Sequence, residues 1–191
     1  MIQRRLKNLL LLTSTNTGIV SLFLLTHSVL LLMMTYTFPA ITAQIKTQAF
    51  DLRPFGYSMI EAQEILQRLD HETIDLYLFP QLFLLDILYP LLLAVFLSSL
   101  MLRLHRLIGV QDSRLYIVPF LAMICDYLEN TTVALLITKS LVVSEGIVQT
   151  ASTFTIMKGV LTSFSWIVVV ILFVIWVRKA YWVDKKQMSL E

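Results

Sequence analysis

The sequence predicts an all-α integral membrane protein: a four-helix bundle forming a single domain over residues 1–191. Of its residues, 57% are hydrophobic and 15% are charged, and the mean hydropathy is +0.76. This composition lies outside the range of soluble globular domains. A membrane-spanning helix needs about 20 largely apolar residues. Four segments meet that requirement: residues 18–38, 78–102, 116–138 and 155–177.

The distribution of basic residues predicts the topology. They gather before the first predicted span, between the second and third spans, and after the fourth: Arg4, Arg5, Lys7, Arg103, Arg106, Arg114, Arg178, Lys179, Lys185 and Lys186. Between the first and second spans, acidic residues outnumber basic ones. Because cytoplasmic loops carry an excess of Lys and Arg, we expect both termini in the cytoplasm and the acidic segment outside, in a multi-pass protein of the bacterial inner membrane. The net charge of +2 follows from this topology and does not predict a nucleic-acid partner.

The segment between the first two spans contains a predicted amphipathic helix. Ser58 and Glu61 have the spacing of a capping box, in which each side chain satisfies a free backbone N–H group near the other residue. Apolar residues follow among charged ones, at Ile60, Ile65, Leu66 and Leu69. This pattern predicts a short helix at the outer interface that leads into the second span. Two roles stay open: a connector that shields the end of the bundle, and a lid over a pocket.

Polar residues inside the third predicted span give the clearest indication of a site. In the stretch MICDYLENTTVALL, Asp126, Glu129 and Asn130 have i, i+3 and i+4 spacing, which places them on one helix face. The other three spans also contain polar residues: Asp86 and Tyr89 in the second, Lys158, Thr162 and Ser165 in the fourth, and His27 in the first.

Depth in the membrane relates these residues to one another. Counted from the outer helix ends at ~1.5 Å per residue, the polar residues on all four spans fall roughly 5–18 Å deep. Lys158 is the shallowest, and its long side chain reaches further in. A charge in the bilayer core costs about 2.5–3.5 kcal/mol, so three acids are expected to face the bundle interior. We therefore predict a shared polar pocket.

Other roles are open to intramembrane polar residues. The polar residues could serve only to hold the helices together, with each interhelical hydrogen bond contributing about 0.6–2 kcal/mol. A metal site is disfavoured, because the Glu-x-x-His pairs of di-iron bundles are absent from the sequence. The sequence also has no P-loop, Gly-rich dinucleotide turn or Gly-x-Ser-x-Gly motif. We therefore expect no metal and no cofactor.

Two protein families resemble this sequence. Asp86 followed by Tyr89-Pro90, then the DYLEN stretch and a lysine early in the fourth span, resembles small uncharacterised bacterial four-helix membrane proteins. The layout of a polar first loop, an acid-plus-proline second span and a basic tail is similar to the four-helix EXPERA-type proteins, the relatives of sterol isomerase and the sigma-2 receptor. In that family intramembrane acids bind an amine or protonate a sterol-like double bond. The resemblance implies that Asp86 and Glu129 correspond to those acids in chemical type.

The function predicted from these residues is the binding of a small amphipathic or lipid-like molecule, with acid/base chemistry as an extension. Asp126 and Glu129 would act as catalytic acid/base groups or counter-ions. The predicted ligand-binding residues are Asp86, Tyr89, Asn130, Lys158, His27, Thr162 and Ser165. The alternatives are a proton- or cation-coupled transporter assembled as a homo-oligomer, and a non-catalytic membrane assembly protein. Membrane lipid is the expected surrounding partner in every case.

Overall fold

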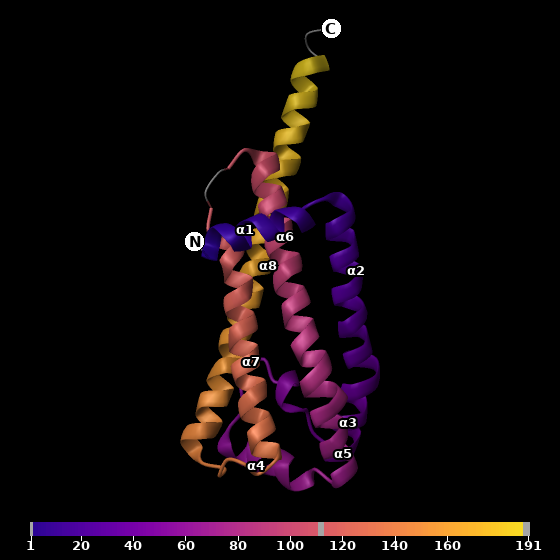
Figure 1. Cartoon of the computed structure of the whole chain (residues 1–191), viewed down its shortest axis with the longest axis vertical. Coiled ribbons are helices and arrows are strands. Elements are labelled where there is room, and N and C mark those ends of the chain that lie inside the picture. Colours follow the sequence, from indigo (N-terminus) through magenta and orange to yellow (C-terminus); the bar gives the residue numbers. More distant parts are fainter. Residues whose placement is uncertain (1, 111–112, 189–191) are drawn as a thin grey trace.

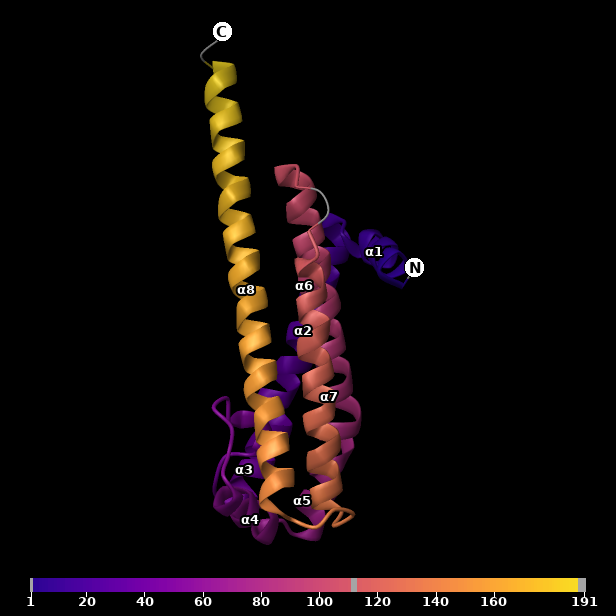
Figure 2. The same cartoon turned by 90° about the vertical axis from the view of Figure 1, so that its left-hand side faces the viewer.

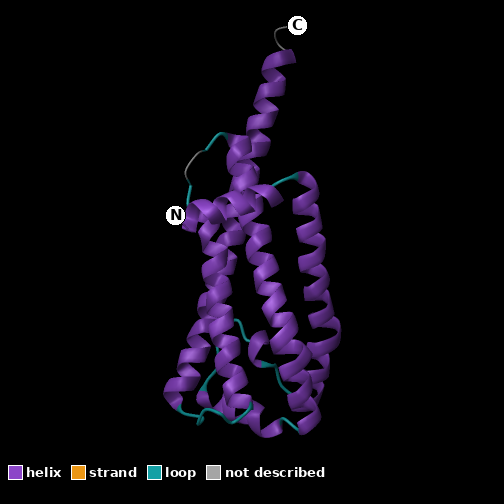
Figure 3. Cartoon of the chain, in the orientation of Figure 1, coloured by secondary structure: helices purple, strands orange, loops and turns teal. Residues whose placement is uncertain are grey.

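The computed structural model describes residues 2–110 and 113–188, and every regular element in these two ranges is a helix (Figures 1 and 3). The α-helices are α1 (Ile2–Thr13), α2 (Asn16–Leu32), α3 (Phe38–Ile45), α4 (Met59–Arg68), α5 (His71–Leu76), α6 (Asp86–Ile108), α7 (Val118–Ile137) and α8 (Glu145–Met188). Two π-helical stretches, Met33–Thr37 and Tyr77–Leu85, and two 3₁₀ turns, Phe50–Leu52 and Leu115–Ile117, complete the list.

Within the described ranges, four continuous helical segments are long and apolar enough to cross a membrane: Asn16–Ile45, His71–Ile108, Leu115–Ile137 and Glu145–Tyr181. They contain the predicted segments 18–38, 78–102 and 155–177, and all of 116–138 except its last residue. The prediction of an all-α protein with four apolar helices of membrane-spanning length is confirmed. The first, second and fourth extend well beyond the predicted ranges, because flanking turns of more polar sequence continue the helices.

The two ends of the bundle differ (Figures 1 and 2). At one end lie α1, the far turns of α8, and the connection between α6 and α7. At the other end lie α3, α4, α5 and the turn between α7 and α8. We call residues 46–70, which connect the first and second long segments, the first loop. Among the basic residues that predict the topology, the side chains of Arg4, Lys185 and Lys186 lie outside the described part of the chain.

The predicted amphipathic helix of the first loop is present as α4. Ser58 caps it, and the reciprocal bonds with Glu61 form the predicted capping box. Ile65 is fully buried and Leu66 is partly buried, as the apolar pattern predicts. Ile60 departs from the pattern, because it is 77% exposed at the first turn of the helix. α4 therefore presents one narrow apolar face to the bundle.

The N-terminal helix α1 was not predicted as a separate element. It lies across the end of the bundle (Figure 2) and packs on α6 through Leu10, which is 3% exposed. The chain turns at Ser14, whose carbonyl oxygen accepts hydrogen bonds from Arg103 (3.1 Å) and Arg106 (2.9 Å). These two guanidinium groups fix the corner between α1 and α2.

Irregular turns interrupt the first and second long segments at the same level. Pro80 has no N–H group to donate within the Tyr77–Leu85 stretch, and Phe79 beside it has an extended backbone (φ −142°, ψ 125°). The Met33–Thr37 stretch is also π-helical. These turns bring Thr37 and Gln81 together, and the Thr37 hydroxyl donates to Gln81 Oε1.

Two apolar clusters form the core, and polar residues lie between them. One cluster packs the first loop against the bundle and includes Phe50, Ile65 and Tyr77. The other, towards α1, includes Phe96 and Met101. The first loop is thus a packed part of the bundle, and this packing brings its residues to the polar layer.

Candidate functional site

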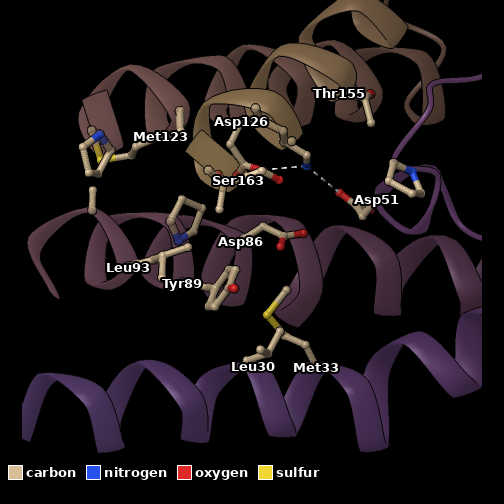
Figure 4. Close-up of a pocket in the computed structure, with 18 of the residues that line it drawn as sticks. Leu30, Met33, Asp51, Asp86, Tyr89, Leu93, Met123, Asp126, Thr155 and Ser163 are labelled. Carbon is tan, nitrogen blue, oxygen red and sulfur yellow. Dashed lines mark ion pairs between the residues drawn. The ribbon is translucent and has the colours of Figure 1, made fainter. Parts of the chain in front are cut away.

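Lys158 of α8 is the centre of a buried charge cluster. Its Nζ lies 2.6 Å from Asp126 Oδ1 and 2.7 Å from Glu129 Oε2, both on α7. It also lies 4.0 Å from Asp51 Oδ1, on the first loop, and the dashed lines in Figure 4 mark the ion pairs of Asp126 and Asp51. Asp126 and Glu129 share one face of α7, as their spacing predicts, so one ammonium group serves both.

Neighbouring polar groups complete the coordination of these carboxyls. Thr155, one turn before Lys158 on α8, donates its hydroxyl hydrogen to Glu129 Oε1 at 2.6 Å. Asn130 donates from Nδ2 to Asp126 Oδ2 at 3.0 Å. Each carboxyl thus has an ion pair on one oxygen and a hydrogen bond on the other. Charge-assisted bonds of this kind are the strong ones in a low-dielectric interior.

Asp51 joins the cluster from the first loop. The Tyr77 hydroxyl donates to Asp51 Oδ2 at 2.9 Å and accepts from the Phe50 N–H group at 3.0 Å. Asp51 Oδ1 has no hydrogen-bond partner, although it is buried. Sequence reasoning counted Asp51 only among the acids of an outer loop. Its position between Phe50 and Leu52, in an apolar stretch, was the available indication that it is buried.

The same loop buries the hydroxyl of Tyr57. Burial, together with the negative charges of Glu129 and Asp51, raises the pKa of this hydroxyl. The Tyr57 N–H group donates to Ser152 Oγ on α8 at 2.8 Å. The first loop is therefore fastened to α8 one to two turns before Lys158.

Asp86, at the start of α6, is the fourth carboxyl of the layer. It is 5% exposed, and its Oδ2 accepts from Gln81 Nε2 at 2.8 Å. Thr37 donates to the oxygen of the same amide, which fixes the direction of the Gln81 side chain. We call Lys158 with Asp51, Asp86, Asp126 and Glu129 the carboxyl–lysine cluster.

A cavity of about 330 Å³ lies beside the cluster, and we call it the main cavity. Its polar end is formed by Asp51, Asp86, Asp126 and Lys158. Its other end is apolar and is lined by residues such as Leu93, Leu97, Pro119 and Met123. Figure 4 shows this polarity, with Leu93 and Met123 at one end and Asp51 and Thr155 at the other.

The main cavity reaches the surface between α2 and α8. Three of its lining residues are exposed at that place: Met34 after α2, Pro54 in the first loop and Ser163 of α8. Leu30 of α2 and Met33 of the π-helical stretch after it line the side of the cavity that faces Asp86 and Asp126 (Figure 4). Because α2 and α8 are both long apolar helices, this opening faces laterally out of the bundle.

Carboxyl groups outnumber the cation in this layer. Three acids line the main cavity together with Lys158, and the same lysine is also paired with Glu129 behind it. A single ammonium cannot balance all of these carboxyls when they are ionised. Protons or a cationic, hydrogen-bond-donating group in the cavity would reduce the imbalance.

The structure places most of the predicted site residues around this layer. Asp86, Tyr89, Asp126, Lys158 and Thr162 line the main cavity. Glu129 is fully buried behind Lys158 and is not among the lining residues. Asn130 supports Asp126 and lines a second cavity between α6 and α7.

His27 and Ser165 were expected in the same layer and lie elsewhere. The His27 ring bonds through Nδ1 to the Phe23 carbonyl at 2.8 Å and packs against Phe23, with ring centroids 4.1 Å apart. The Ser165 hydroxyl donates to the Leu161 carbonyl at 2.8 Å. Neither residue lines the main cavity. Both lie at the level of Phe96, because the His27 and Phe96 ring centroids are 6.1 Å apart and Trp166, next to Ser165, packs on the same ring at 6.1 Å. Phe96 follows Asp86 by ten residues in α6, about 15 Å along the axis. The predicted depths were counted from segment ends at residues 38 and 155, whereas the helices continue to Ile45 and begin at Glu145, so both residues lie deeper than expected.

A protein-ligated metal is not supported by the arrangement of these side chains. Across residues 2–110 and 113–188, no three His, Cys, Asp or Glu side chains are grouped in a way that could hold a metal ion. The carboxyls are instead arranged around an ammonium group, which occupies the place a cation would take.

Searches of protein-family models, curated proteins and solved structures found no match to this chain.

Proposed function

We propose that this protein binds a small amphipathic molecule in the main cavity, with the head group against the carboxyl–lysine cluster and the tail along the apolar end. The observation that carries this proposal is the polarity of the cavity itself, with charged and apolar residues at opposite ends. Its volume of about 330 Å³ lies near the lower limit of the ~300–1,000 Å³ typical of small-molecule pockets. A ligand with one short chain fits that size.

The excess of carboxyl groups determines which head group suits the site. Asp51 Oδ1 lacks a hydrogen-bond donor, and Asp86 and Asp126 line the same end. A protonated amine or a hydroxyl donates hydrogen bonds to such acceptors, whereas a carboxylate would add a further negative charge. The proposed ligand therefore has a hydrogen-bond-donating head group, preferably a cationic one.

In this proposal the acid/base role belongs to Asp126. It lines the main cavity, and Lys158 and Asn130 hold its carboxyl in one orientation. Glu129, the other predicted catalytic acid, has the role of positioning Lys158 in this proposal. The lateral opening between α2 and α8 supplies the ligand from the bilayer.

The proposal is tested with a matched series of ten-carbon chains: decylamine, decanol and decanoate. The protein is placed in lipid nanodiscs, and saturable adducts are counted by native mass spectrometry. Decylamine and decanol are expected to bind at one site, and decanoate at least about tenfold more weakly. Asp126→Asn is expected to weaken decylamine binding about tenfold, while Glu72→Gln, a change at an exposed acid of α5, leaves it unchanged.

Two results would count against ligand binding. Equal binding of all three compounds in both variants would show that the carboxyls do not select the ligand. Accumulation of decylamine inside proteoliposomes, driven by a pH gradient and lost in Asp126→Asn, would instead support the transporter.

A further inference from the structure

A second cavity of about 270 Å³ lies between α6 and α7, and we call it the α6–α7 groove. Phe83 and Ile87 on one side and Thr131 on the other are exposed at its rim. Asp86 and Asn130 also line it, and they are 5% and 7% exposed. The groove therefore has an apolar rim and a buried polar floor.

The Asn130 amide has an unsatisfied acceptor in this groove. Its Nδ2 donates to Asp126 Oδ2, and a carboxylate accepts hydrogen bonds but does not donate them. Reversing the amide would bring its oxygen against that carboxylate oxygen, so the orientation is fixed. Asn130 Oδ1 is left buried without a partner. Such an acceptor requires a small donor from the groove.

Asp86 lines the groove and also the main cavity. Gln81 Nε2 occupies its Oδ2. The charged groups that share the main cavity with it come from each neighbouring element: Asp51 from the first loop, Asp126 from α7 and Lys158 from α8. Asp86 is thus one carboxyl that two separate cavities share.

We propose that the α6–α7 groove is a second access route to the carboxyl–lysine cluster, through which water and hydronium reach Asp86 without passing the opening between α2 and α8. Thr131 lies about 9 Å along the axis from the end of α7 at Ile137, at ~1.5 Å per residue. The route from the end of the bundle to Asp86 is therefore short. Tyr127 and Thr131 line it, and their hydroxyls donate to the backbone carbonyls of Ile87 and Tyr127, at 2.7 Å each.

The second route matters when the main cavity is occupied. A ligand in that cavity blocks the opening between α2 and α8, while the groove on the α6–α7 face stays open. A hydronium ion there transfers one proton to the Asp86 carboxylate, forming a carboxyl O–H bond and leaving water. This role in proton supply rests on the proposed function, whereas the access of small molecules to Asp86 does not.

Access is tested with diisopropylcarbodiimide applied to membranes containing the protein. The reagent takes the proton of a protonated carboxyl on nitrogen, and the carboxyl oxygen adds to its central carbon, giving an adduct that peptide mass spectrometry assigns to a residue. Thr131→Trp fills the groove, and Ser163→Trp fills the opening of the main cavity. We expect Thr131→Trp to lower adduct formation at Asp86 at least about tenfold and Ser163→Trp to change it less than about twofold.

Controls separate this result from misfolding and from the proposed function. Folding of both variants is checked with maleimide, which should not react with Cys125 while that residue stays buried. If Thr131→Trp does not fold, Ile87→Trp takes its place. Absence of an Asp86 adduct in the unmodified protein, or undiminished labelling when the groove is filled, overturns the proposal. Decylamine is expected to protect Asp126 and not Asp86. If decylamine does not protect Asp126 from the carbodiimide, the proposed ligand binding is refuted, whereas the proposed access through the α6–α7 groove is not.

Discussion

Replacing Lys158 with methionine removes the only positive charge among the described residues of the carboxyl–lysine cluster while keeping a similar side-chain length. Lys158 is paired at 2.6 Å and 2.7 Å with two carboxyls, and its side chain is 18% exposed. The variant leaves Asp126 and Glu129 buried near each other, where Asn130 still donates a hydrogen bond to Asp126 and Thr155 still donates one to Glu129.

Two independent considerations give the magnitude of the effect. Removing one partner of a buried ion pair costs about 3–5 kcal/mol. The folded variant can instead protonate one of the two buried carboxyls. For a carboxyl with an ordinary pKa of about 4.3, protonation at pH 7 costs about 3.7 kcal/mol. The two values agree, so we expect Lys158→Met to lose about 3–5 kcal/mol of unfolding free energy at pH 7.

The pH dependence of this loss has a definite sign. The folded variant binds a proton that its unfolded chain releases at pH 7, so its stability rises as the pH falls towards the ordinary carboxyl pKa. Protonation at pH 5 costs about 1 kcal/mol. The deficit relative to the unmodified protein is therefore expected to shrink by about 2–3 kcal/mol between pH 7 and pH 5.

Cys125 provides the assay, because it is the single cysteine and is 7% exposed. A fluorogenic maleimide reports its exposure during thermal and denaturant unfolding in detergent micelles at pH 7, and a parallel circular-dichroism melt covers pH 5, where maleimide reacts slowly. Lys179→Met is the matched control, because Lys179 donates one exposed bond to the Ile108 carbonyl; it should stay within about 0.5 kcal/mol. A Lys158→Met protein as stable as the unmodified one, with no change between the two pH values, would refute the reasoning.

Three further variants test the surroundings of the cluster. Glu129→Gln is expected to lose about 1 kcal/mol or less of unfolding free energy, because the amide oxygen can face Lys158 and the amide nitrogen can face the Thr155 hydroxyl. Glu129→Leu is expected to lose about 3–5 kcal/mol in the same melts. Equal losses in the two variants would contradict this prediction. Gly56→Ala is expected to loosen the first loop, because its Cβ would clash with Ser152 Oγ and its φ is +81°. Gly146→Ala is the neutral control, because a Cβ there meets nothing within 4 Å. Proteolysis of the first loop measures the difference, and equal cleavage of the two variants would count against this prediction. Ser58→Ala is expected to cost about 1 kcal/mol of local stability. Hydrogen bonds from the Ser58 backbone N–H and hydroxyl lower the Glu61 pKa from 4.5. The capping box therefore stabilises the loop fully above pH 4.5, and this stabilisation is lost as the pH falls through the lowered pKa. Hydrogen exchange of the α4 amides measures the effect, and an exchange rate that does not change in Ser58→Ala would contradict it.

The sequence was sufficient to place residues along a helix. Asp126 and Glu129 share a face because their spacing matches the helical repeat, and the capping box marks the start of α4 because Ser and Glu at that spacing satisfy local backbone groups. Lys158 was expected to reach deeper than its Cα position, and its Nζ does reach both acids. These features depend on local geometry alone.

Features that depend on the arrangement of helices in space were not predicted. Depth depends on where a helix ends, and the first segment continues to Ile45, seven residues beyond its predicted end. His27 was therefore placed in the layer although its ring lies beside Phe96, deeper in the bundle. The contact between Thr37 and Gln81 depends on two irregular turns. Asp51 reaches the cluster because the first loop folds back into the bundle, which the apolar residues Phe50 and Ile65 stabilise by burial. Long-range packing of this kind has no periodicity to detect.

The crosswise helix α1 has a consequence for the response of the protein to bilayer thickness. Leu9 and Leu12 are 63% and 75% exposed on α1, and the arginine bonds at Ser14 fasten this helix to α6. A bundle normally adapts to a thinner or thicker bilayer by tilting, but tilting here would lift or submerge one end of α1. In a bilayer the mismatch would therefore fall on the opposite end, where the first loop carries Asp51 into the cluster. Bilayer thickness would then act on the segment whose Asp51, Leu52 and Pro54 line the main cavity.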